Sequence, residues 1–348
     1  MVNHFMPESG VKHGGVVQMA HTLAQGLALR GHEVTVWTYS PRPVDALYQV
    51  KPLPGERFAR SWLGARLTFG LLGNIFFALP RYRDLDVLVA HGDTALLWLR
   101  RSDVVRIMHG SGLGEAFSSR NPLRFILQLI IFMQEAFSAL VQANTIGVSR
   151  NTTRHNPFVR KWIHNGIDTQ LFRPDEGLRS QHPSILFVGT LGGRKRGAWL
   201  VDLFQTNILP RIPNATLHLV TEAGEELPNV VYHTGITDEQ LSLLYRKCWI
   251  YASPSKYEGF GLPYIEAMSS NTPVLASPNP GSLEVIGDRE CGILAKDDDF
   301  AQRLFDLLTD SDLRAQCSKA GMKRAEEFSL DCMLDNYESM FQIMARDA

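Results

Sequence analysis

The stretch of residues 253–287 constrains this chain most, because it combines a loop, a helix and a strand in one short run. An apolar, strand-like segment precedes it at 248–252 (CWIYA), and the loop at 258–261 (EGFG) carries little side-chain cover. A proline opens the helix expected over 263–270, because its fixed φ suits the first turn. The sequence therefore predicts a strand–loop–helix–strand unit whose next strand lies at 273–277.

The loop of this unit suits an anion, and two carboxylates beside it suit hydroxyl groups. Its two glycines and the helix start expose backbone N–H groups that an anion can meet, with help from the helix dipole. Glu258 and Glu266 would repel a phosphate, so we expect them to accept hydrogen bonds from sugar hydroxyls. The combination predicts a nucleotide-sugar site. The alternative is an ordinary strand–loop–helix with no ligand.

Length and composition set the class of protein. The chain has 348 residues, enough for two domains, with 45% hydrophobic residues, 20% charged residues and a formal net charge of -1. This charge exerts no pull toward nucleic acid or acidic lipid. Four cysteines far apart, without metal-ligand spacing, favour a reducing compartment and unpaired thiols. We find no signal peptide and no uninterrupted apolar run of about 18 residues, and we expect a cytoplasmic protein.

The first half of the chain begins as a Rossmann-like unit. A short strand at 1–6 precedes Gly14-Gly15 and a helix with an apolar face at 16–28. Gly31 is expected to end this helix, and a strand follows at 33–39. The G-x-G-x-x-G fingerprint is absent, which argues against a plain dinucleotide dehydrogenase.

The rest of the first half mixes irregular and apolar segments. Residues 41–56 are expected to be irregular, and 61–79 to form a core helix, with an acceptor surface or a membrane contact as alternatives. The remaining elements expected here are buried strands at 86–91 and 104–109, an apolar-faced helix at 125–143, and strands at 145–149 and 161–163.

The second half repeats the α/β pattern after a polar linker at 175–182. Thr237 and Gln240 form a predicted capping box. Asp297–Asp299 is expected to be a loop and helix N-cap rather than a metal cluster, since no His or Glu completes a ligand set. The expected strands are 184–188, 216–220, 230–233, 249–252, 273–276 and 292–295, and helices are expected at 300–309 and 325–344.

The run E-G-F-G-L-P-x-x-E-A-M, followed by T-P-V-L-A-S, resembles the signature of retaining glycosyltransferases of the GT-B fold, family four (glycosyl transferases group 1). Other places match the family as well. They are Gly14-Gly15, His109 in I-M-H-G, Asn165–Asp168 with Phe172 and Pro174, Phe187–Gly189, and Glu284.

This resemblance implies an α/β protein of the GT-B fold, with two facing Rossmann-like parallel-sheet domains and the active site in the cleft between them. Residues 1–172 would form the acceptor-binding domain and 173–325 the donor-binding domain. Residues 326–348 would form a C-terminal helix that packs back on the N-terminal domain.

The resemblance also implies roles for individual residues. His109 would contact the donor sugar near its reacting carbon, Glu258 the sugar hydroxyls and Glu266 the ribose hydroxyls. A packing turn at the glycine pair and a core or surface histidine are the alternatives. The candidate catalytic residues are His109, Lys195, Arg196 and Glu258; the candidate donor-binding residues are Gly14, Gly15, Arg194, Gly259, Phe260, Gly261, Leu262 and Glu266.

The basic cluster Arg194-Lys195-Arg196 departs from the family pattern. Three cations at a strand end suit a diphosphate, which gains negative charge as it leaves; a solvated basic loop is the alternative. The family usually has Arg directly after Val-Gly and Lys directly before the later Gly, where this chain has Thr190 and Arg196. Arg194 or Lys195 would supply the missing charge, and the sequence does not decide which. Asn271 replaces a common Gly and also tolerates the left-handed conformation.

The activity implied is transfer of a hexose-type sugar from a nucleotide-diphosphate sugar to an acceptor hydroxyl, with retention of configuration and without metal or cofactor. The leaving phosphate would take the acceptor's proton. The acceptor is expected to be a glycan, a lipid-linked molecule or a small molecule, and peripheral membrane contact is left open. Two alternatives stay open: a nucleotide-sugar 2-epimerase, and a non-catalytic nucleotide-sugar-binding subunit, which the missing Arg at Thr190 favours.

Overall fold

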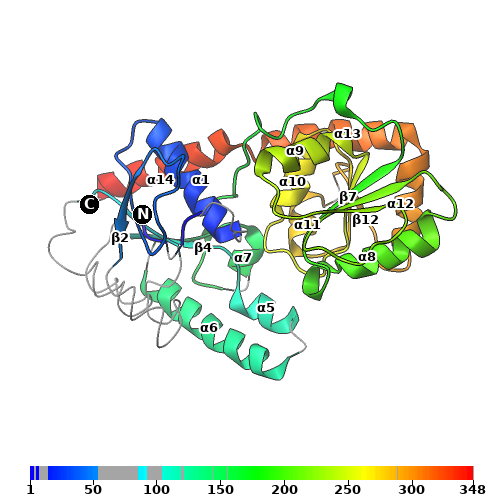
Figure 1. Ribbon diagram of the computed structural model, residues 1–348. Coiled ribbons are helices and arrows are strands. Elements are labelled where there is room, and N and C mark those ends of the chain that lie inside the picture. The colour runs from blue at the N-terminus through cyan, green and yellow to red at the C-terminus, as the bar shows by residue number, and fades with distance from the viewer. Residues whose placement is uncertain are drawn as a thin grey trace. The chain divides into compact units, whose positions relative to one another are not determined.

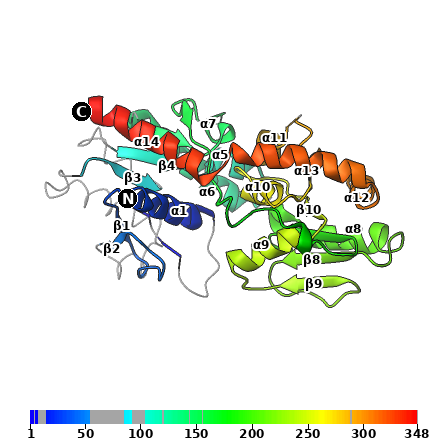
Figure 2. The same cartoon turned by 90° about the horizontal axis from the view of Figure 1, so that it is seen from above.

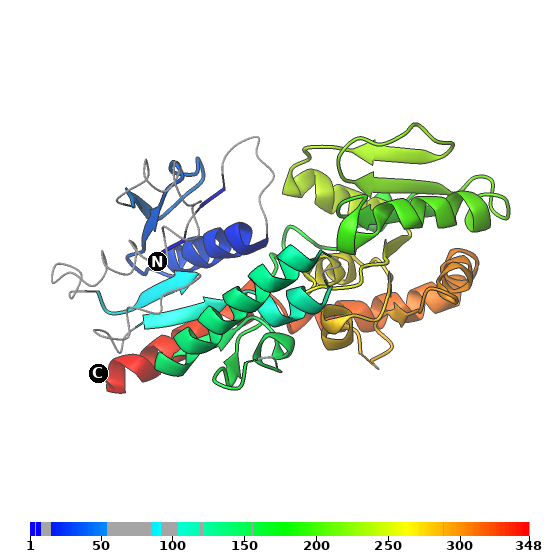
Figure 3. The same ribbon diagram turned by 90° about the horizontal axis from the view of Figure 1, so that it is seen from below.

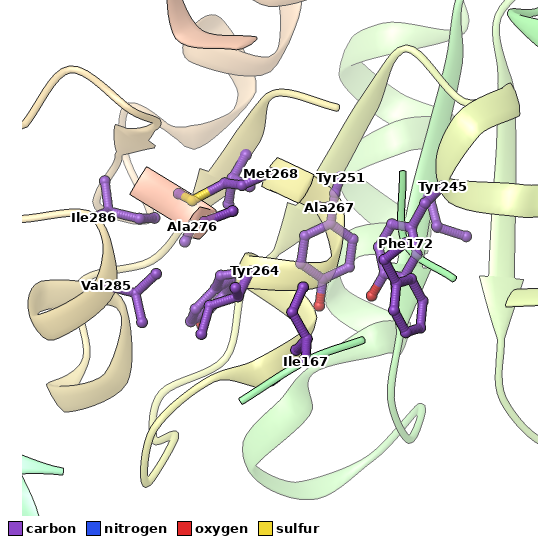
Figure 4. Close-up of a cluster of buried hydrophobic side chains, with 14 of the residues drawn as sticks. Ile167, Phe172, Tyr245, Tyr251, Tyr264, Ala267, Met268, Ala276, Val285 and Ile286 are labelled. Carbon is purple, nitrogen blue, oxygen red and sulfur yellow. The ribbon is translucent and has the colours of Figure 1, made fainter. Parts of the chain in front are cut away.

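The computed structural model describes residues 1–3, 5–7, 15–53, 85–91, 104–118, 121–142, 144–154, 156–287 and 289–347. The chain divides into two compact units, residues 1–165 with 333–348 and residues 166–332. The sequence placed the boundary at 172/173. The division falls earlier because Ile167 and Phe172 are buried in the core of the second unit, where the Phe172 ring packs edge-on against Tyr245 (Figure 4).

The first unit contains parallel strands in two sets. Strands β3 (Leu88–His91), β4 (Val104–Met108), β5 (Thr145–Gly147) and β6 (Lys161–Trp162) form one sheet in this order, and β1 (Thr35–Thr38) pairs with β2 (Gln49–Pro52). Val2 bridges both sets, to Trp37 and to Ala90. The strand expected at 1–6 is therefore a single bridging residue in the described part, and β2 lies in a segment that was expected to be irregular.

Helices cover both faces of this sheet. Figure 1 shows α1 (Gly15–Leu29) and α14 (Leu330–Asp347) on one face, and α5 (Gly112–Ser118) and α6 (Pro122–Val141) on the other. A Cβ at Gly26 would lie 2.7 Å from Leu334, so glycine permits the close approach of α14 to α1. Arg30 adds ion pairs of 2.6 Å to Asp335 and 2.7 Å to Glu338. A further short helix, α7, spans Arg150–Arg154.

Helix α6, the long helix in the foreground of Figure 3, carries exposed apolar side chains. Gln128 and Ser138 are buried, and the Glu135 carboxylate accepts a hydrogen bond from the Gly112 amide at 3.0 Å. The exposed side chains include Leu123, Ile126, Leu127, Ile130, Met133, Phe137 and Leu140. The predicted apolar-faced helix is confirmed, but the apolar stripe is not its buried face. Among the described residues, no helix combines the length and the apolar character that a membrane span needs.

The second unit has a fully parallel sheet of order β12-β11-β10-β7-β8-β9. The strands match the predicted ones to within one residue at each end: β10 is shifted by one residue, and β11 and β12 are slightly shorter than predicted. They are β7 (Ser184–Val188), β8 (Thr216–Val220), β9 (Val230–His233), β10 (Ile250–Ser253), β11 (Val274–Ala276) and β12 (Ile293–Leu294).

Alternate residues of these strands belong to two separate cores; the strands and the helices that cover them can be followed in Figure 2. Leu186 and Tyr251 pack with α9 (Asp238–Lys247) and α10 (Leu262–Ser269). Phe187 and Ala252, one position later in each strand, pack with α8 (Gly197–Leu203) and α12 (Phe300–Thr309). Helices α11 (Pro280–Val285) and α13 (Ser311–Glu326) complete the unit.

Several local predictions are confirmed. Thr237 and Gln240 form the capping box, and Asn271 takes the left-handed conformation with φ 58°. Asp299 occupies the N-cap position of α12 but makes no side-chain capping bond. All four cysteines are free.

The helix predicted at 325–344 is two helices, because the chain breaks between α13 and α14. Ile167 lies against this break in a parallel bridge to Ser329. Its N–H donates to the Phe328 carbonyl at 2.9 Å, and its carbonyl accepts from the Leu330 N–H at 2.8 Å. Gly166 is needed beside this joint, since a Cβ there would lie 2.8 Å from the Leu330 Cα.

We predict that Gly166→Ala lowers the free energy of unfolding by about 1–3 kcal/mol, because the added methyl meets backbone that cannot move aside. Thermal or urea unfolding measures the change. Gly177→Ala is the matched control, since its nearest neighbour would be the Asp175 carboxylate at an ordinary 3.4 Å. Equal losses in the two variants would contradict the crowding at Gly166.

Candidate active site

The carboxyl ends of β7 and β10 form the centre of the candidate site in the second unit. The strand order reverses between these neighbours, since β8 and β9 follow on one side and β11 and β12 on the other. Open parallel sheets bind ligands outside the carboxyl ends at such a reversal. Residues 189–196 follow β7 and residues 254–261 follow β10. The Lys256 N–H donates to the Arg194 carbonyl at 2.9 Å and joins the two loops.

Glu258 is held between two cations at this point. Its Oε2 lies 2.8 Å from Nη1 of Arg194, and its Oε1 lies 2.7 Å from Nζ of Lys195. The residue is only 7% exposed. Burial alone would raise the pKa of this carboxyl, but Lys195 and Arg194 hold it below its ordinary value. Glu258 is therefore ionised at neutral pH and fixed in orientation.

Lys195 lies closest to the end of β7. A Cβ at Gly189 would be 3.1 Å from both Cβ and Cδ of Lys195, so the lysine stem crosses directly over this glycine. Its side chain is 17% exposed, against 46% for Arg194, which also donates to the Tyr257 carbonyl at 2.5 Å. Lys195 thus fills the space next to Thr190.

Arg196 is held separately from the other two cations. It adopts the left-handed conformation with φ 60° and makes two bonds to Asp297, of 2.7 and 2.9 Å. Its guanidinium lies 4.1 Å from the centre of the Trp199 ring. The sequence analysis missed this role of Asp297. No signal in the sequence pairs the two residues, because the contact joins segments 101 positions apart.

The loop before α10 requires a glycine at its last position. Gly261 has φ 104°, and a Cβ there would lie 2.4 Å from the Tyr264 ring, so only glycine fits. No side chain caps the start of α10 at Leu262. Phe260, in contrast, is 5% exposed and packs on Phe328. Its side chain therefore belongs to the core.

Glu266 lies within α10 and is partly buried. The Tyr245 hydroxyl donates to its Oε2 at 2.9 Å. Burial raises the pKa of this carboxyl to about 7, although the bond from Tyr245 opposes the rise. Near neutral pH this group exchanges between a hydrogen-bond acceptor and a protonated form.

In the first unit, His109 follows β4, and Gly15 begins α1. A Cβ on Gly15 would meet no atom within 4 Å, so this backbone borders open space. Gly14 lies outside the described residues. Nδ1 of His91 lies 2.8 Å from Nε2 of His109, and burial lowers the pKa of His109 to about 4. The sequence analysis did not single out His91.

Metal ligands were sought among the same residues. Within the described ranges, no group of three or more His, Cys, Asp or Glu side chains could hold a metal ion.

Comparison with known proteins gives the family. The model described as "Glycosyl transferases group 1" matches residues 168–324, and that described as "Glycosyltransferase Family 4" matches residues 13–171. A D-inositol 3-phosphate glycosyltransferase of Corynebacterium aurimucosum is 31% identical over 96% of this chain and 92% of its own length. This chain belongs to the group 1 glycosyltransferases.

Another relative matches over a shorter segment. The O-antigen chain mannosyltransferase B of Escherichia coli is 31% identical over 41% of this glycosyltransferase, and the match spans only 42% of that relative's length. The relatives that match are described as glycosyltransferases and mannosyltransferases, and the first of them are matched over less than half of their length.

Solved structures show the fold of this glycosyltransferase. Sucrose-phosphate synthase from Thermosynechococcus elongatus superposes with a TM-score of 0.77 at 20% identity, over 96% of this chain and 94% of that one. Anabaena HepE, solved with UDP and glucose, gives 0.70 at 15% identity, over 98% of both chains. The fold is GT-B, built from two Rossmann-like domains with parallel sheets, as the sequence predicted.

The raised pKa of Glu266 predicts a pH dependence of stability. The folded state binds this proton more tightly than the unfolded chain, whose carboxyl has the ordinary value of 4.5. The stabilisation that the folded state gains from binding this proton is complete below pH 4.5 and is lost as pH rises through about 7. The loss is on the order of 3 kcal/mol.

Urea unfolding of wild type and Glu266→Gln between pH 4 and 8 measures this loss of stability. The wild type should lose stability relative to the variant as pH rises across that window. Glu326→Gln, an exposed carboxylate on α13, controls for the loss of one acidic group. Parallel curves for wild type and Glu266→Gln would contradict the prediction.

Proposed function

We propose that this enzyme transfers a hexose-type sugar from a nucleotide-diphosphate sugar to an acceptor hydroxyl with retention of configuration. One observation carries the proposal. An ionised, oriented Glu258 and two cations stand at the strand-order reversal, beside the start of α10, which no side chain caps. Anion binders and a hydroxyl acceptor are placed side by side, as a sugar diphosphate requires.

In this proposal Lys195, Arg194 and the loop amides bind the diphosphate. The negative charge on this group grows as the sugar leaves, so fixed cations stabilise the transition state more than the ground state. Lys195 takes the place of the family's arginine at Thr190, since its stem already crosses the end of β7. Arg196 is bound to Asp297 and takes no direct part in holding the diphosphate.

Glu258 accepts hydrogen bonds from the sugar hydroxyls, and Glu266 from the ribose hydroxyls. Tyr245 occupies one side of the Glu266 carboxylate and leaves Oε1 for the ligand. His109 contacts the sugar near its reacting carbon, and Gly14 and Gly15 contribute backbone amides to the phosphate.

The chemical step proposed needs no enzymic nucleophile, metal or cofactor. The bond from the anomeric carbon to the phosphate oxygen breaks as the acceptor oxygen bonds to the same face of that carbon. The acceptor's proton passes to the leaving phosphate. The described residues near Glu258 offer cations and amides for the departing charge, which supports this route.

The identity of the substrates is proposed only as a class. The relatives include proteins described as mannosyltransferases, and HepE was solved with UDP and glucose; both support a hexose on a nucleoside diphosphate. The acceptor is a glycan, a lipid-linked molecule or a small molecule. The four free cysteines support a reducing, cytoplasmic setting.

We also propose peripheral contact with a membrane, where the enzyme would meet a lipid-linked acceptor. The exposed face of α6 carries large apolar side chains, and its single acidic residue, Glu135, is turned to Gly112. An apolar helix face without carboxylates suits a lipid surface. Residues 61–79, the segment first considered for this role, lie outside the described residues.

The stereochemistry of the product tests the proposal. Purified enzyme, given a panel of UDP-, GDP-, ADP- and dTDP-sugars with axial anomeric bonds, should form an axial product in the presence of EDTA, as read by NMR. An inverted product would contradict retention. Donor-only incubation separates the alternatives: epimerisation needs no acceptor, and a non-catalytic subunit neither hydrolyses nor transfers.

We predict that Lys195→Ala and Glu258→Ala each lower kcat by about 10²–10³-fold, the size seen when one charge-stabilising group is removed. Thermal unfolding should show that both still fold. Lys323→Ala, an exposed lysine on α13, is the control and should retain activity.

A compensating change sharpens this test. Thr190→Arg should restore part of the activity of Lys195→Ala, because the lysine stem crosses Gly189, the residue before position 190, and should restore less to Arg194→Ala. Wild-type rates in Lys195→Ala, or equal rescue of the two variants, would show that Lys195 does not hold the diphosphate.

A further inference from the structure

Two histidines meet at the carboxyl edge of the first unit's sheet. His91 ends β3, where it is 1% exposed, and His109 directly follows β4, the neighbouring strand. The register places His91 opposite Ile107, two positions before His109. The His91 N–H is also tied to the Val2 carbonyl at 3.0 Å, so the backbone of the inner histidine is fixed.

The two rings meet edge to edge. Nδ1 of His91 and Nε2 of His109 are 2.8 Å apart, the ring centroids are 5.1 Å apart, and the planes differ by 19°. The centroid separation exceeds the nitrogen separation by twice the distance from the centre of an imidazole ring to its nitrogen. Both nitrogens therefore lie on the line between the centroids. An imidazole N–H and an imidazole lone pair both point along this direction. The contact is therefore an in-line hydrogen bond.

One nitrogen of this bond carries the proton and the other is bare. If His109 donates, His91 must carry its own proton on Nε2. That atom is buried and makes no hydrogen bond. If His91 donates from Nδ1, its Nε2 is bare instead. A buried N–H without an acceptor is the rarer defect in proteins, so the second arrangement is favoured.

We propose that His91 is a positioning residue that donates from its Nδ1 to Nε2 of His109 and thereby fixes the proton of His109 on Nδ1. His109 then presents an N–H to the donor sugar and acts as a hydrogen-bond donor, not as a base. This inference rests on the proposed role of His109. It assigns to His91 the role of orienting His109, which packing at the end of β3 would not require.

The surroundings keep the pair neutral, as this arrangement requires. Burial lowers the pKa of both imidazoles, well below the ordinary value for His91, and His109 further disfavours charge on His91. A neutral donor keeps its proton through the reaction and stabilises oxygen atoms that gain negative charge.

The ring nitrogens can be read directly. Long-range ¹H–¹⁵N correlation spectra of enzyme labelled with ¹⁵N-histidine distinguish protonated from bare nitrogens, and His109→Gln assigns the signals. We expect His109 to be protonated on Nδ1 and bare on Nε2. A proton on Nε2 of His109 in the wild type would overturn the proposal.

Two nearly isosteric substitutions test the consequence for catalysis. His91→Asn keeps an N–H at the position of Nδ1, whereas His91→Asp offers only an acceptor there and pulls the His109 proton to Nε2. His91→Asn should keep kcat within about threefold, and His91→Asp should lose about 10–100-fold in kcat with little change in KM, the scale for groups that orient a functional imidazole. Equal kcat in the two variants would overturn the proposal.

A second histidine pair provides the control. His218 and His233 on β8 and β9 meet in the same way, with nitrogens 3.0 Å and centroids 5.3 Å apart at 23°. His218→Asp introduces the same chemical change and should leave kcat unchanged; a matching loss there would mean that the effect of His91→Asp is only structural.

The two proposals fail in different ways. If the wild type transfers no sugar from any donor in the panel, the proposed function fails. The nitrogen spectra of the wild type still decide the tautomer of His109, and they do so even if His91→Asp does not fold.

Discussion

The ion pairs of Glu258 with Arg194 and Lys195 are the constraint on which the site depends. A carboxylate that is 7% exposed is stable in ionised form only with cations beside it, so the loop after β10 must lie against the loop after β7. That requirement places the Glu258 carboxylate, which can accept hydrogen bonds from hydroxyl groups, next to two positive charges. Both groups are needed to hold a sugar through its diphosphate, and neither would stay in place without the other.

The parallel sheets determine where such a pair can form. In the second unit the strand order reverses between β7 and β10, which leaves a place outside their carboxyl ends that no crossover helix covers. The first unit has its own reversal, where Val2 bridges β1 and β3, and His91 ends β3 at that place. In each unit, the carboxyl ends of adjacent parallel strands bring polar side chains together, from β7 and β10 in the second unit and from β3 and β4 in the first.

The sequence predicted the elements of this enzyme better than the contacts between them. Strands β7, β8 and β9 were predicted to the residue. For β7 and β8 the reason is that buried parallel strands are largely apolar runs bounded by turn residues. The pairs Arg196–Asp297, Tyr245–Glu266 and His91–His109 were not predicted, since tertiary packing brings distant segments together. Phe260 was predicted as a donor-binding residue from its place in the motif, and its side chain packs in the core.

A crystal structure with a nucleotide-diphosphate sugar bound tests the central claim most directly. The account predicts the diphosphate against Nζ of Lys195 and the amides of residues 259–262, with the sugar hydroxyls on Glu258 and the ribose hydroxyls on Oε1 of Glu266. A nucleotide bound away from the carboxyl ends of β7 and β10, with Glu258 still closed on both cations, would contradict it.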